Sequence, residues 1–292
     1  MIRLIGILTG LFFALMAVWG FGTGLATVIS DGQLKEKTAE YEFHLKPRDA
    51  GLASDGAFGK WDLAQLQRGM QVYKEVCAAC HGLKFVAFRD LAALGYSEAE
   101  VKAIAAGFQV PGIDPTTGEA NTRPGLPTDY FPSPYPNAVA AAAANNNAIP
   151  PDLSLMAKAR KDGSNYVYSL LTGYRDVNTF TVDGKTVKQV FPEFATPPNT
   201  HFNPYFANLN IAMAAPLMVD GQVTYAEGQP APTVDQMSKD IAAFLTWTAE
   251  PKLENRKETG VAVILFLIIA WLSTAPMRLV DGEAKLQGSA LL

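Results

Sequence analysis

The sequence predicts a mainly α-helical fold with small β-hairpin insertions, a C-terminal transmembrane helix and a possible N-terminal one. Three observations lead to this prediction. Capping residues precede segments in which apolar residues recur at helical spacing. Two Asp-Gly pairs are flanked by β-branched residues, which is the strongest short-range signal for a hairpin. Long uncharged segments occupy both ends of the chain.

The clearest helix of the central region is expected to begin after Asp62, which resembles a capping box together with Gln65. Apolar residues follow at helical spacing up to Cys77. Further helices are expected after the capping box at Ser97, over 138–144, from Pro150-Pro151-Asp152, over 164–172, and after the capping box at Thr233 as far as Pro251. Helices therefore dominate the predicted body.

Tight hairpins are expected at Asp183-Gly184 and Asp220-Gly221. The two central residues of such a turn need positive φ, and an Asp-Gly pair adopts it readily. Between residues 111 and 136, prolines and glycines argue against long regular elements.

The N-terminal segment, residues 1–30, carries no charge from Leu4 to Ser30. A signal peptide normally has an apolar stretch of only ~7–15 residues followed by a small-residue cleavage site. Here the uncharged run is longer and lacks a clean Ala-x-Ala motif. A helix of ~20 residues spans a membrane, so we expect a retained membrane helix, with a cleaved signal peptide as the alternative. In both cases the following residues are exported.

The C-terminal segment, residues 259–278, is predicted to be a transmembrane anchor. Its stretch 260–277 has no charge, no polar face, and Trp271 as an interfacial anchor. Residues 31–258 then form the domain between these two segments, and 279–292 form a tail.

Charge argues against nucleic-acid binding. The chain has 28 acidic and 24 Lys or Arg residues, a formal net charge of −4, and no basic stripe to neutralise phosphates. This balance suits a cationic partner.

The chemical signature is the run Cys77-Ala78-Ala79-Cys80-His81, which contains the only two cysteines of the chain. This C-x-x-C-H spacing is the attachment signature of a c-type haem, with the histidine as proximal iron ligand. The alternatives are a thioredoxin-like dithiol, half of a zinc site, or two idle cysteines. A dithiol would require a βαβ context and zinc a second ligand pair, and neither is present. We therefore predict one covalently attached haem c. Because such attachment takes place outside the membrane, residues 31–258 are expected to be periplasmic and the tail cytoplasmic.

The ligand at the sixth coordination position of the iron decides whether the haem only transfers electrons or also catalyses a reaction. The candidates are His44, His201 and several methionines. Met213 lies in a short apolar loop far downstream of the cysteines, as the ligand methionine of small cytochromes does, but methionine is more often core filler. From spacing alone the choice stays open.

The ordered motifs of the chain resemble one family, cytochrome c1, the haem subunit of the ubiquinol–cytochrome c oxidoreductase (bc1) complex, bacterial type. Over roughly residues 57 to 278 the resemblance rests on the haem signature and on Arg68-Gly69-x-Gln71-Val72-Tyr73, Arg123-Pro124-Gly125, Asp129-Tyr130-Phe131-Pro132-x-Pro134-Tyr135-Pro136-Asn137, Pro150-Pro151-Asp152-Leu153-Ser154, Tyr166-Val167-x-Ser169-Leu170-Leu171-Thr172-Gly173-Tyr174, Phe202-Asn203-Pro204-Tyr205-Phe206, Ile211-Ala212-Met213-Ala214 and Phe244-Leu245-x-Trp247-x-Ala249-Glu250-Pro251.

The resemblance implies roles for particular residues. Met213 would be the sixth ligand, so that the iron is held by His81 and Met213. Arg123 would face a haem propionate, and the Pro150-Pro151 turn would supply the carbonyl that accepts the other ring N–H of His81. Two further residues are implied as pocket lining: Tyr130 and Asn145.

The resemblance also implies a function. The subunit would take an electron from the Rieske iron–sulfur protein and pass it to a cytochrome c, beside cytochrome b, in a dimeric complex of the inner membrane, with no substrate bond made or broken on this chain. The competing functions are a membrane-anchored haem enzyme, such as a peroxidase, and a haem sensor or haem-delivery protein. A haem enzyme would require an open or His-bound sixth position and a distal base.

Overall fold

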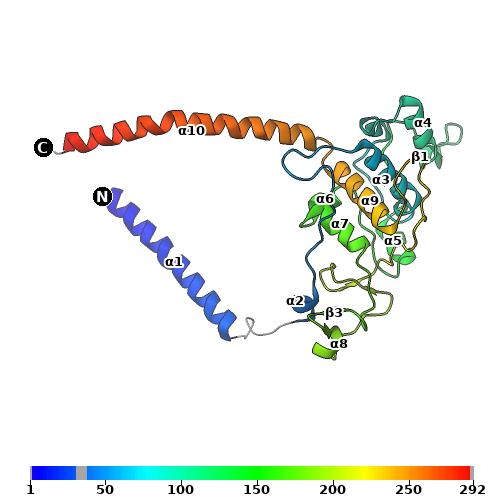
Figure 1. Ribbon diagram of the computed structural model, residues 1–292, viewed down its shortest axis with the longest axis horizontal. Helices are drawn as coiled ribbons and strands as arrows, with labels where there is room; N and C mark the ends of the chain where they lie inside the picture. Colours follow the sequence, from blue (N-terminus) through cyan, green and yellow to red (C-terminus); the bar gives the residue numbers. More distant parts are fainter. Residues whose placement is uncertain (1, 31–37, 290–292) are drawn as a thin grey trace. The chain divides into compact units, whose positions relative to one another are not determined.

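The computed structural model describes the backbone of residues 2–30 and 38–289, and the side chains of residues 3–30 and 38–273 (Figure 1). The chain divides into two units, each described by itself. The first comprises residues 1–44 and 177–195, and the second comprises residues 45–176 and 196–292.

The first unit contains an apolar helix, α1 (Ile2–Ser30), and a small cluster formed by four short elements. Among the described residues, Arg3–Ser30 is the one helix long and apolar enough to cross a membrane, with a mean hydropathy of 2.2 and no buried residues. In the cluster, Phe43 and Phe191 make an edge-to-face ring contact at 6.2 Å, and Val187 is fully buried. Its elements are α2 (Ala39–Phe43), β3 (Thr181–Val182), β4 (Lys185–Thr186) and α8 (Val187–Val190).

The second unit is organised around two crossing helices, α3 (Leu63–Glu75) and α9 (Val234–Ala249) (Figure 1). They meet at Gly69, where an added Cβ would lie 2.1 Å from the Asp240 carbonyl oxygen. Only glycine fits there, because any other side chain would push the helices apart. The surrounding core is apolar and almost fully buried, and includes Tyr73, which packs against Phe131 and Phe244.

A buried ion pair also joins the two helices. Arg68 donates from Nε to Asp240 Oδ2 at 2.9 Å and from Nη2 to Asp240 Oδ1 at 3.1 Å. Asp240 is completely buried and also accepts from Gln65 and Gln236. A buried charge is tolerated when it is paired and its remaining lone pairs are satisfied, as they are here. The pair therefore fixes the register of α3 on α9.

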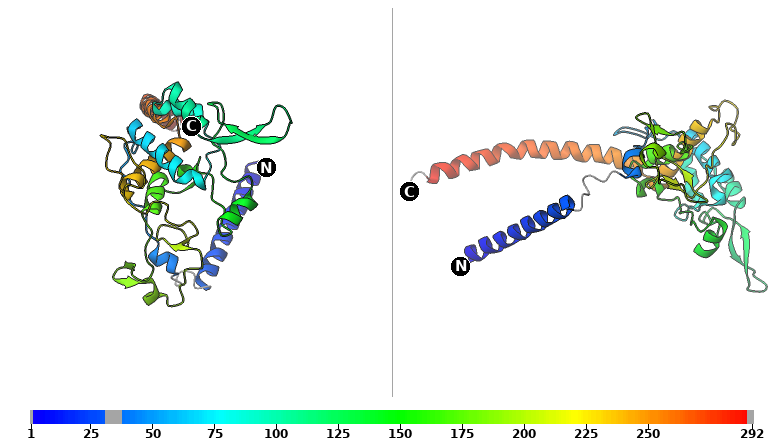
Figure 2. Two further views of the ribbon diagram at one scale, coloured as in Figure 1. Left: turned by 90° about the vertical axis from the view of Figure 1, so that its right-hand side faces the viewer. Right: turned by 90° about the horizontal axis from the view of Figure 1, so that it is seen from below.

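The remaining elements surround this pair of helices. They are the 3₁₀ segments η1 (Cys77–Ala79) and η2 (Phe88–Leu94), the helices α4 (Glu98–Ala106), α5 (Ala138–Ala144), α6 (Met156–Ala159), α7 (Gly163–Leu171) and α10 (Leu253–Ser289), and the strands β1 (Gln109–Ile113), β2 (Ala120–Pro124), β5 (His201–Phe202) and β6 (Asn210–Ile211). The strands pair antiparallel as β1–β2 and β5–β6. Within this unit, the β1–β2 hairpin projects on the side away from α10 (Figure 2).

The predicted helix starts are confirmed by their caps. Asp62 accepts from Gln65 N–H, Ser97 forms a capping box with Glu100, and Thr233 accepts from Gln236 N–H. The helix expected from Pro150-Pro151-Asp152 begins later, at Met156. The reason is that the Asp152 carboxylate accepts from Lys84 N–H and Ser154 N–H, which holds this stretch in a turn.

One of the two predicted hairpins is present. Asp183 and Gly184 both have positive φ between β3 and β4. The hairpin expected at Asp220-Gly221 was wrong: Gly221 N–H donates to Pro232, and Asp220 Oδ1 accepts from Val234 N–H at the start of α9. Asp220 therefore satisfies the first N–H of α9, and the pair does not join two strands.

The C-terminal anchor expected over 259–278 lies within α10. Its described large apolar side chains, from Val263 to Leu272, are exposed. The side chains from residue 274 onward, which include those at the end of the expected anchor and in the tail, lie outside the described residues.

Candidate functional site

The C-x-x-C-H run forms a single tight turn at the end of α3. Cys80 N–H and His81 N–H both donate to the Cys77 carbonyl, at 3.1 and 2.9 Å. Both cysteines are free thiols and half-buried. The turn therefore presents two thiols and one imidazole in fixed relative positions on a helix that is anchored by α9.

His81 is oriented through its ring. Its Nδ1 lies 2.7 Å from the Pro151 carbonyl oxygen. A carbonyl only accepts hydrogen bonds, so Nδ1 must carry the proton and Nε2 of the neutral ring keeps its lone pair. Burial lowers the pKa of His81, although the Pro151 bond and Asp152 oppose this effect. The hydrogen bond expected at the Pro150-Pro151 turn is thus present, and it leaves Nε2 free to bind a metal.

The turn is also held from its backbone. Tyr73 donates its hydroxyl to the His81 carbonyl at 2.9 Å, and Leu153 N–H donates to the Gly82 carbonyl at 2.9 Å. These bonds tie the histidine both to α3 and to the segment that supplies Pro151. The sequence analysis assigned no role in the site to Tyr73 or Asp152. The only signal for them was that both belong to motifs shared with the family.

The Cys77 thiol is kept protonated by its surroundings. Burial raises the pKa of Cys77 to about 12, and nearby Cys80 raises it further. Tyr135 donates its hydroxyl toward Cys80 Sγ at 3.8 Å. In the described part of the chain no group of three or more His, Cys, Asp and Glu side chains gathers to hold a bare metal ion. Two thiols three positions apart, followed by an oriented imidazole, are the donor set that a covalent haem requires, so the residues present fit this group.

Met213 lies in the loop after β6. It is half-buried, next to the buried Ile211, and its carbonyl accepts from the Tyr174 hydroxyl at 3.0 Å. The competing methionine, Met218, is 75% exposed. No hydrogen bond between described residues joins the Met213 loop to His81, so its role as iron ligand stays a prediction. Tyr174, which holds this loop, was not singled out from the sequence.

Arg123 lies on β2 and pairs with Asp129. Its Nη1 donates to Oδ2 at 2.6 Å and its Nη2 to Oδ1 at 2.9 Å, so the pair is bidentate. Hydrogen bonds from Arg123 and from Leu126 N–H hold the pKa of Asp129 below its ordinary value. The guanidinium is therefore partly engaged within the protein. Asp129 was missed as its partner, because the sequence alone does not say which acid meets which base.

Tyr130 and Asn145, both expected to line the pocket, differ in their surroundings. Tyr130 is half exposed and forms a backbone bridge with Ala87, shortly after the His81 turn. Asn145 ends α5 and donates from Nδ2 to the Ala141 carbonyl at 2.7 Å. Backbone pairing thus brings Tyr130 near the segment after His81, whereas Asn145 is tied to its own helix.

A mainly helical domain whose C-x-x-C-H turn fits a covalent haem is typical of a c-type cytochrome, and comparison with known proteins identifies the group. The model of the Cytochrome C1 family matches residues 52–279. The chain is 49% identical to cytochrome c1 of Rhodospirillum rubrum over 215 residues, which are 73% of this chain and 78% of that protein. It is 44% identical to the mitochondrial cytochrome c1 haem protein of Saccharomyces cerevisiae over 213 residues, 73% of this chain and 64% of that protein.

A further relative is named cytochrome b/c1, from Bradyrhizobium diazoefficiens. The two are 48% identical over 233 residues, which are 77% of this chain but 34% of that protein. The chain belongs to the cytochrome c1 family.

Proposed function

We propose that this chain passes single electrons from a Rieske iron–sulfur protein to a cytochrome c. As a member of its family it is the electron-transfer haem subunit of the bc1 complex. The observation that carries the proposal is the bond between His81 Nδ1 and the Pro151 carbonyl, directly after two free thiols. This arrangement prepares one imidazole nitrogen for iron and two sulfurs for covalent attachment.

The residues of the chain would share the work of holding the haem. Cys77 and Cys80 would form the thioether bonds, and His81 Nε2 and the Met213 thioether would be the two protein ligands of the iron. Bound haem supplies a reversible one-electron couple. A Met/His pair raises the reduction potential of that couple, because the soft thioether favours ferrous iron.

The other site residues would shape the pocket. Arg123 would face a propionate with the N–H groups that Asp129 and the Pro124 carbonyl leave free, since a guanidinium has five donors and three of them are engaged. The Pro150-Pro151 turn would keep the His81 ring in one tautomer. Tyr130 and Asn145 would line the pocket.

The proposed surroundings follow from the family and from the apolar segments. The protein is membrane-anchored. We place the domain 31–258 on the periplasmic face of the inner membrane, beside cytochrome b, with 259–278 as an anchor and 279–292 as a cytoplasmic tail. The relative named cytochrome b/c1 supports cytochrome b as a neighbour. The complex would be a dimer.

The experiment is to purify the complex and follow its haem spectra. Ferric protein should show the weak near-infrared band of sulfur ligation, and the reduced protein should not bind carbon monoxide. Under quinol, haem reduction on this chain should follow reduction of the Rieske cluster and precede reduction of cytochrome c. Rapid carbon monoxide binding by the reduced wild type would instead indicate an open sixth position, and with it a haem enzyme or a sensor.

A further inference from the structure

One exposed aromatic ring lies beside the start of α10. Phe58 is 82% exposed, at the tip of a loop that we call the 53–60 loop. A single exposed ring needs no explanation by itself. Phe58 differs because hydrogen bonds close its loop and join the loop to α10.

The 53–60 loop is closed by its own backbone. Lys60 N–H donates to the Ala53 carbonyl at 3.0 Å, and Asp55 Oδ2 accepts from Leu52 N–H at 3.0 Å. At Gly59 an added Cβ would lie 2.0 Å from the Asp55 carbonyl oxygen, so the loop closes only around glycine. Phe58 is therefore presented by a built turn.

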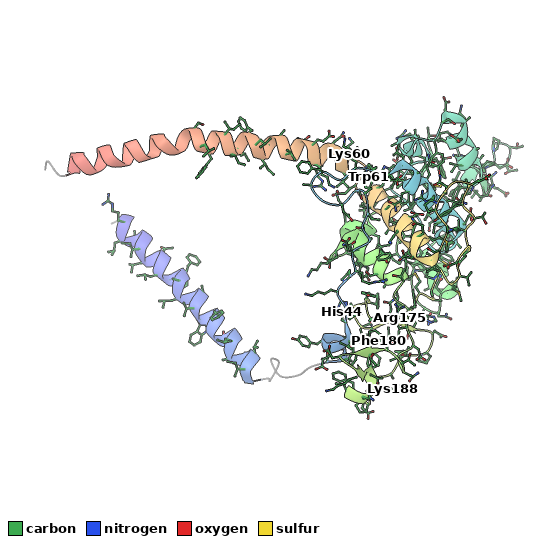
Figure 3. The ribbon with its side chains drawn as sticks, viewed as in Figure 1. His44, Lys60, Trp61, Arg175, Phe180 and Lys188 are labelled. Carbon is green, nitrogen blue, oxygen red and sulfur yellow. The ribbon has the colours of Figure 1, made fainter. Side chains whose placement is uncertain are left out.

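Three contacts bind the 53–60 loop and the next residue to the first turns of α10. Trp61 N–H donates to Glu254 Oε1 at 2.6 Å, and Lys257 Nζ donates to the Ser54 carbonyl at 2.5 Å. A weaker pair joins Lys60 to Glu258 at 3.9 Å. Figure 3 shows Lys60 and Trp61 at this junction. The loop and the base of α10 thus form one piece.

Between them lies a cavity of about 320 Å³. One wall consists of residues 57–60, including Phe58, and the other is a single helical face of α10: Glu254, Lys257, Glu258 and Val261. Val261 begins the apolar part of α10, and Val263 and Ile264, whose side chains are exposed, follow within about 5 Å along the helix axis. Phe58 therefore lies at the level where the helix changes from polar to apolar.

We propose that the 53–60 loop is a contact of the haem domain with the bilayer surface. The Phe58 ring enters the boundary between headgroups and acyl chains, and Lys60 and Lys257 lie level with the headgroup phosphates. The inference rests on the proposed function, in which α10 crosses the membrane. An apolar ring flanked by cations is the pattern of interfacial segments, which enter this boundary by about 5–10 Å.

The continuity of the surface argues for lipid over a protein partner. The exposed apolar face of α10 passes directly into the cavity beside Phe58. Two cations and two carboxylates line that cavity, so its charge is balanced and matches a zwitterionic headgroup.

The test is an accessibility measurement on the full-length haem protein in phosphatidylcholine nanodiscs. A spin label is placed at position 58 by Phe58→Cys, and its relaxation is compared in oxygen, which enters the bilayer, and in a nickel chelate, which stays in water. The matched control is Ile113→Cys, because Ile113 is also exposed, at 72%, but lies on the β1–β2 hairpin away from α10. We expect the ratio of oxygen to nickel accessibility to be several-fold higher at position 58 than at position 113. Equal ratios at the two positions would overturn the proposal.

Two further labels separate the possible failures. Ile268→Cys, within α10, reports on the anchor itself: if it is accessible to nickel, the proposed anchor fails, whatever position 58 shows. If position 268 lies in lipid while position 58 is in water, only the present inference fails. The same label at position 58 in the assembled complex should stay accessible to oxygen. Protection from both reagents there would mean that another subunit, and not lipid, covers the 53–60 loop.

Discussion

His81 is held at three polar atoms by three different parts of the chain. Its backbone N–H donates to Cys77, its carbonyl accepts from Tyr73, and its Nδ1 bonds to Pro151. Each bond contributes only about 1 kcal/mol to stability, but together they define the ring orientation before any haem is present. Pre-organisation of a ligand in this way reduces the rearrangement that binding requires.

Replacing Met213 tests the sixth ligand. Met213→Leu keeps the apolar volume but removes the sulfur, so the near-infrared band should disappear and the reduced haem should bind carbon monoxide. The reduction potential should fall, because axial ligands control a range of roughly 0.8 V. Electron transfer to cytochrome c should then largely stop. Spectra and a potentiometric titration are the measurements.

The control for this variant is Met218→Leu. Met218 is exposed, so its replacement should change neither the spectrum nor the potential. If the band is lost in Met218→Leu and kept in Met213→Leu, the wrong methionine was assigned.

The Arg123–Asp129 pair predicts a pH-dependent loss of stability. Arg123 lowers the pKa of Asp129 in the folded protein, whereas an unfolded Asp titrates near ~3.9. The stabilisation is therefore present above that value and is lost as the pH falls through the folded pKa. Arg123→Gln should lower the melting temperature at pH 6–7, and its difference from wild type should shrink below about pH 4.

Arg175→Gln is the matched control, because Arg175 donates to the backbone carbonyls of Thr172 and Tyr174. Its effect should not depend on pH in this way. A pH-independent difference for Arg123→Gln would mean that its ion pair does not contribute.

At the scale of elements, the crossing of α3 and α9 depends on the absence of a side chain. Gly69→Ala would place a methyl group 2.1 Å from the Asp240 carbonyl oxygen and 2.6 Å from Phe244 Cβ. We expect a loss of about 1–3 kcal/mol in the free energy of unfolding, as for other overpacked cores. Gly260→Ala is the control, because nothing lies within 4 Å of that position and alanine favours a helix. Equal stability of the two variants, measured by chemical denaturation, would contradict the close crossing.

Local signals predicted those elements whose hydrogen bonds are local. The caps at Asp62, Ser97 and Thr233 bond within their own first turns, and the sequence places them correctly. The predictions at Asp220 and Asp152 were wrong because both carboxylates accept hydrogen bonds from residues that are distant in sequence. Asp220 accepts from Val234, and Asp152 accepts from Lys84. The same residue type fits a hairpin or a helix start equally well in isolation.

In the candidate site, too, the local features could be predicted and the long-range contacts could not. The Cys77–His81 turn could be predicted from spacing alone, since its geometry arises within five residues. The partner of Arg123 and the role of Tyr174 could not, because they depend on how distant loops meet. The β1–β2 hairpin was not predicted either, because its strands carry no clear alternation and include Pro111 and Pro124.

At the scale of the whole molecule, the base of α10 belongs to the haem domain. Glu254 and Lys257 hold the segment around the 53–60 loop. A chain ended after Thr259 should therefore retain a stable, reducible domain, whereas one ended after Lys252 should melt at a lower temperature. If α1 is retained in the mature protein, either form should stay on the membrane until residues 1–30 are also removed. Membrane fractionation and thermal melting check these outcomes, and equal melting temperatures for the two truncations would contradict the assigned role of α10.

The net charge of −4 on this chain predicts that a basic cytochrome c is attracted to it. Opposite charges accelerate the encounter, and salt screens them over about 8–10 Å at physiological ionic strength. The second-order rate of cytochrome c reduction should fall as salt rises, which stopped-flow measurements can follow. A rate that is flat across ionic strength would indicate an apolar docking surface.

The buried pair between Arg68 and Asp240 joins residues 172 positions apart. Synthesis proceeds from the N-terminus, so α3 and the two cysteines that follow it are made long before α9 is available to pack on them. A 13-residue helix is only marginally stable on its own in water. The Cys77–His81 turn at the end of α3 therefore takes its ordered form only once α9 packs on that helix, when nearly the whole domain has been synthesised.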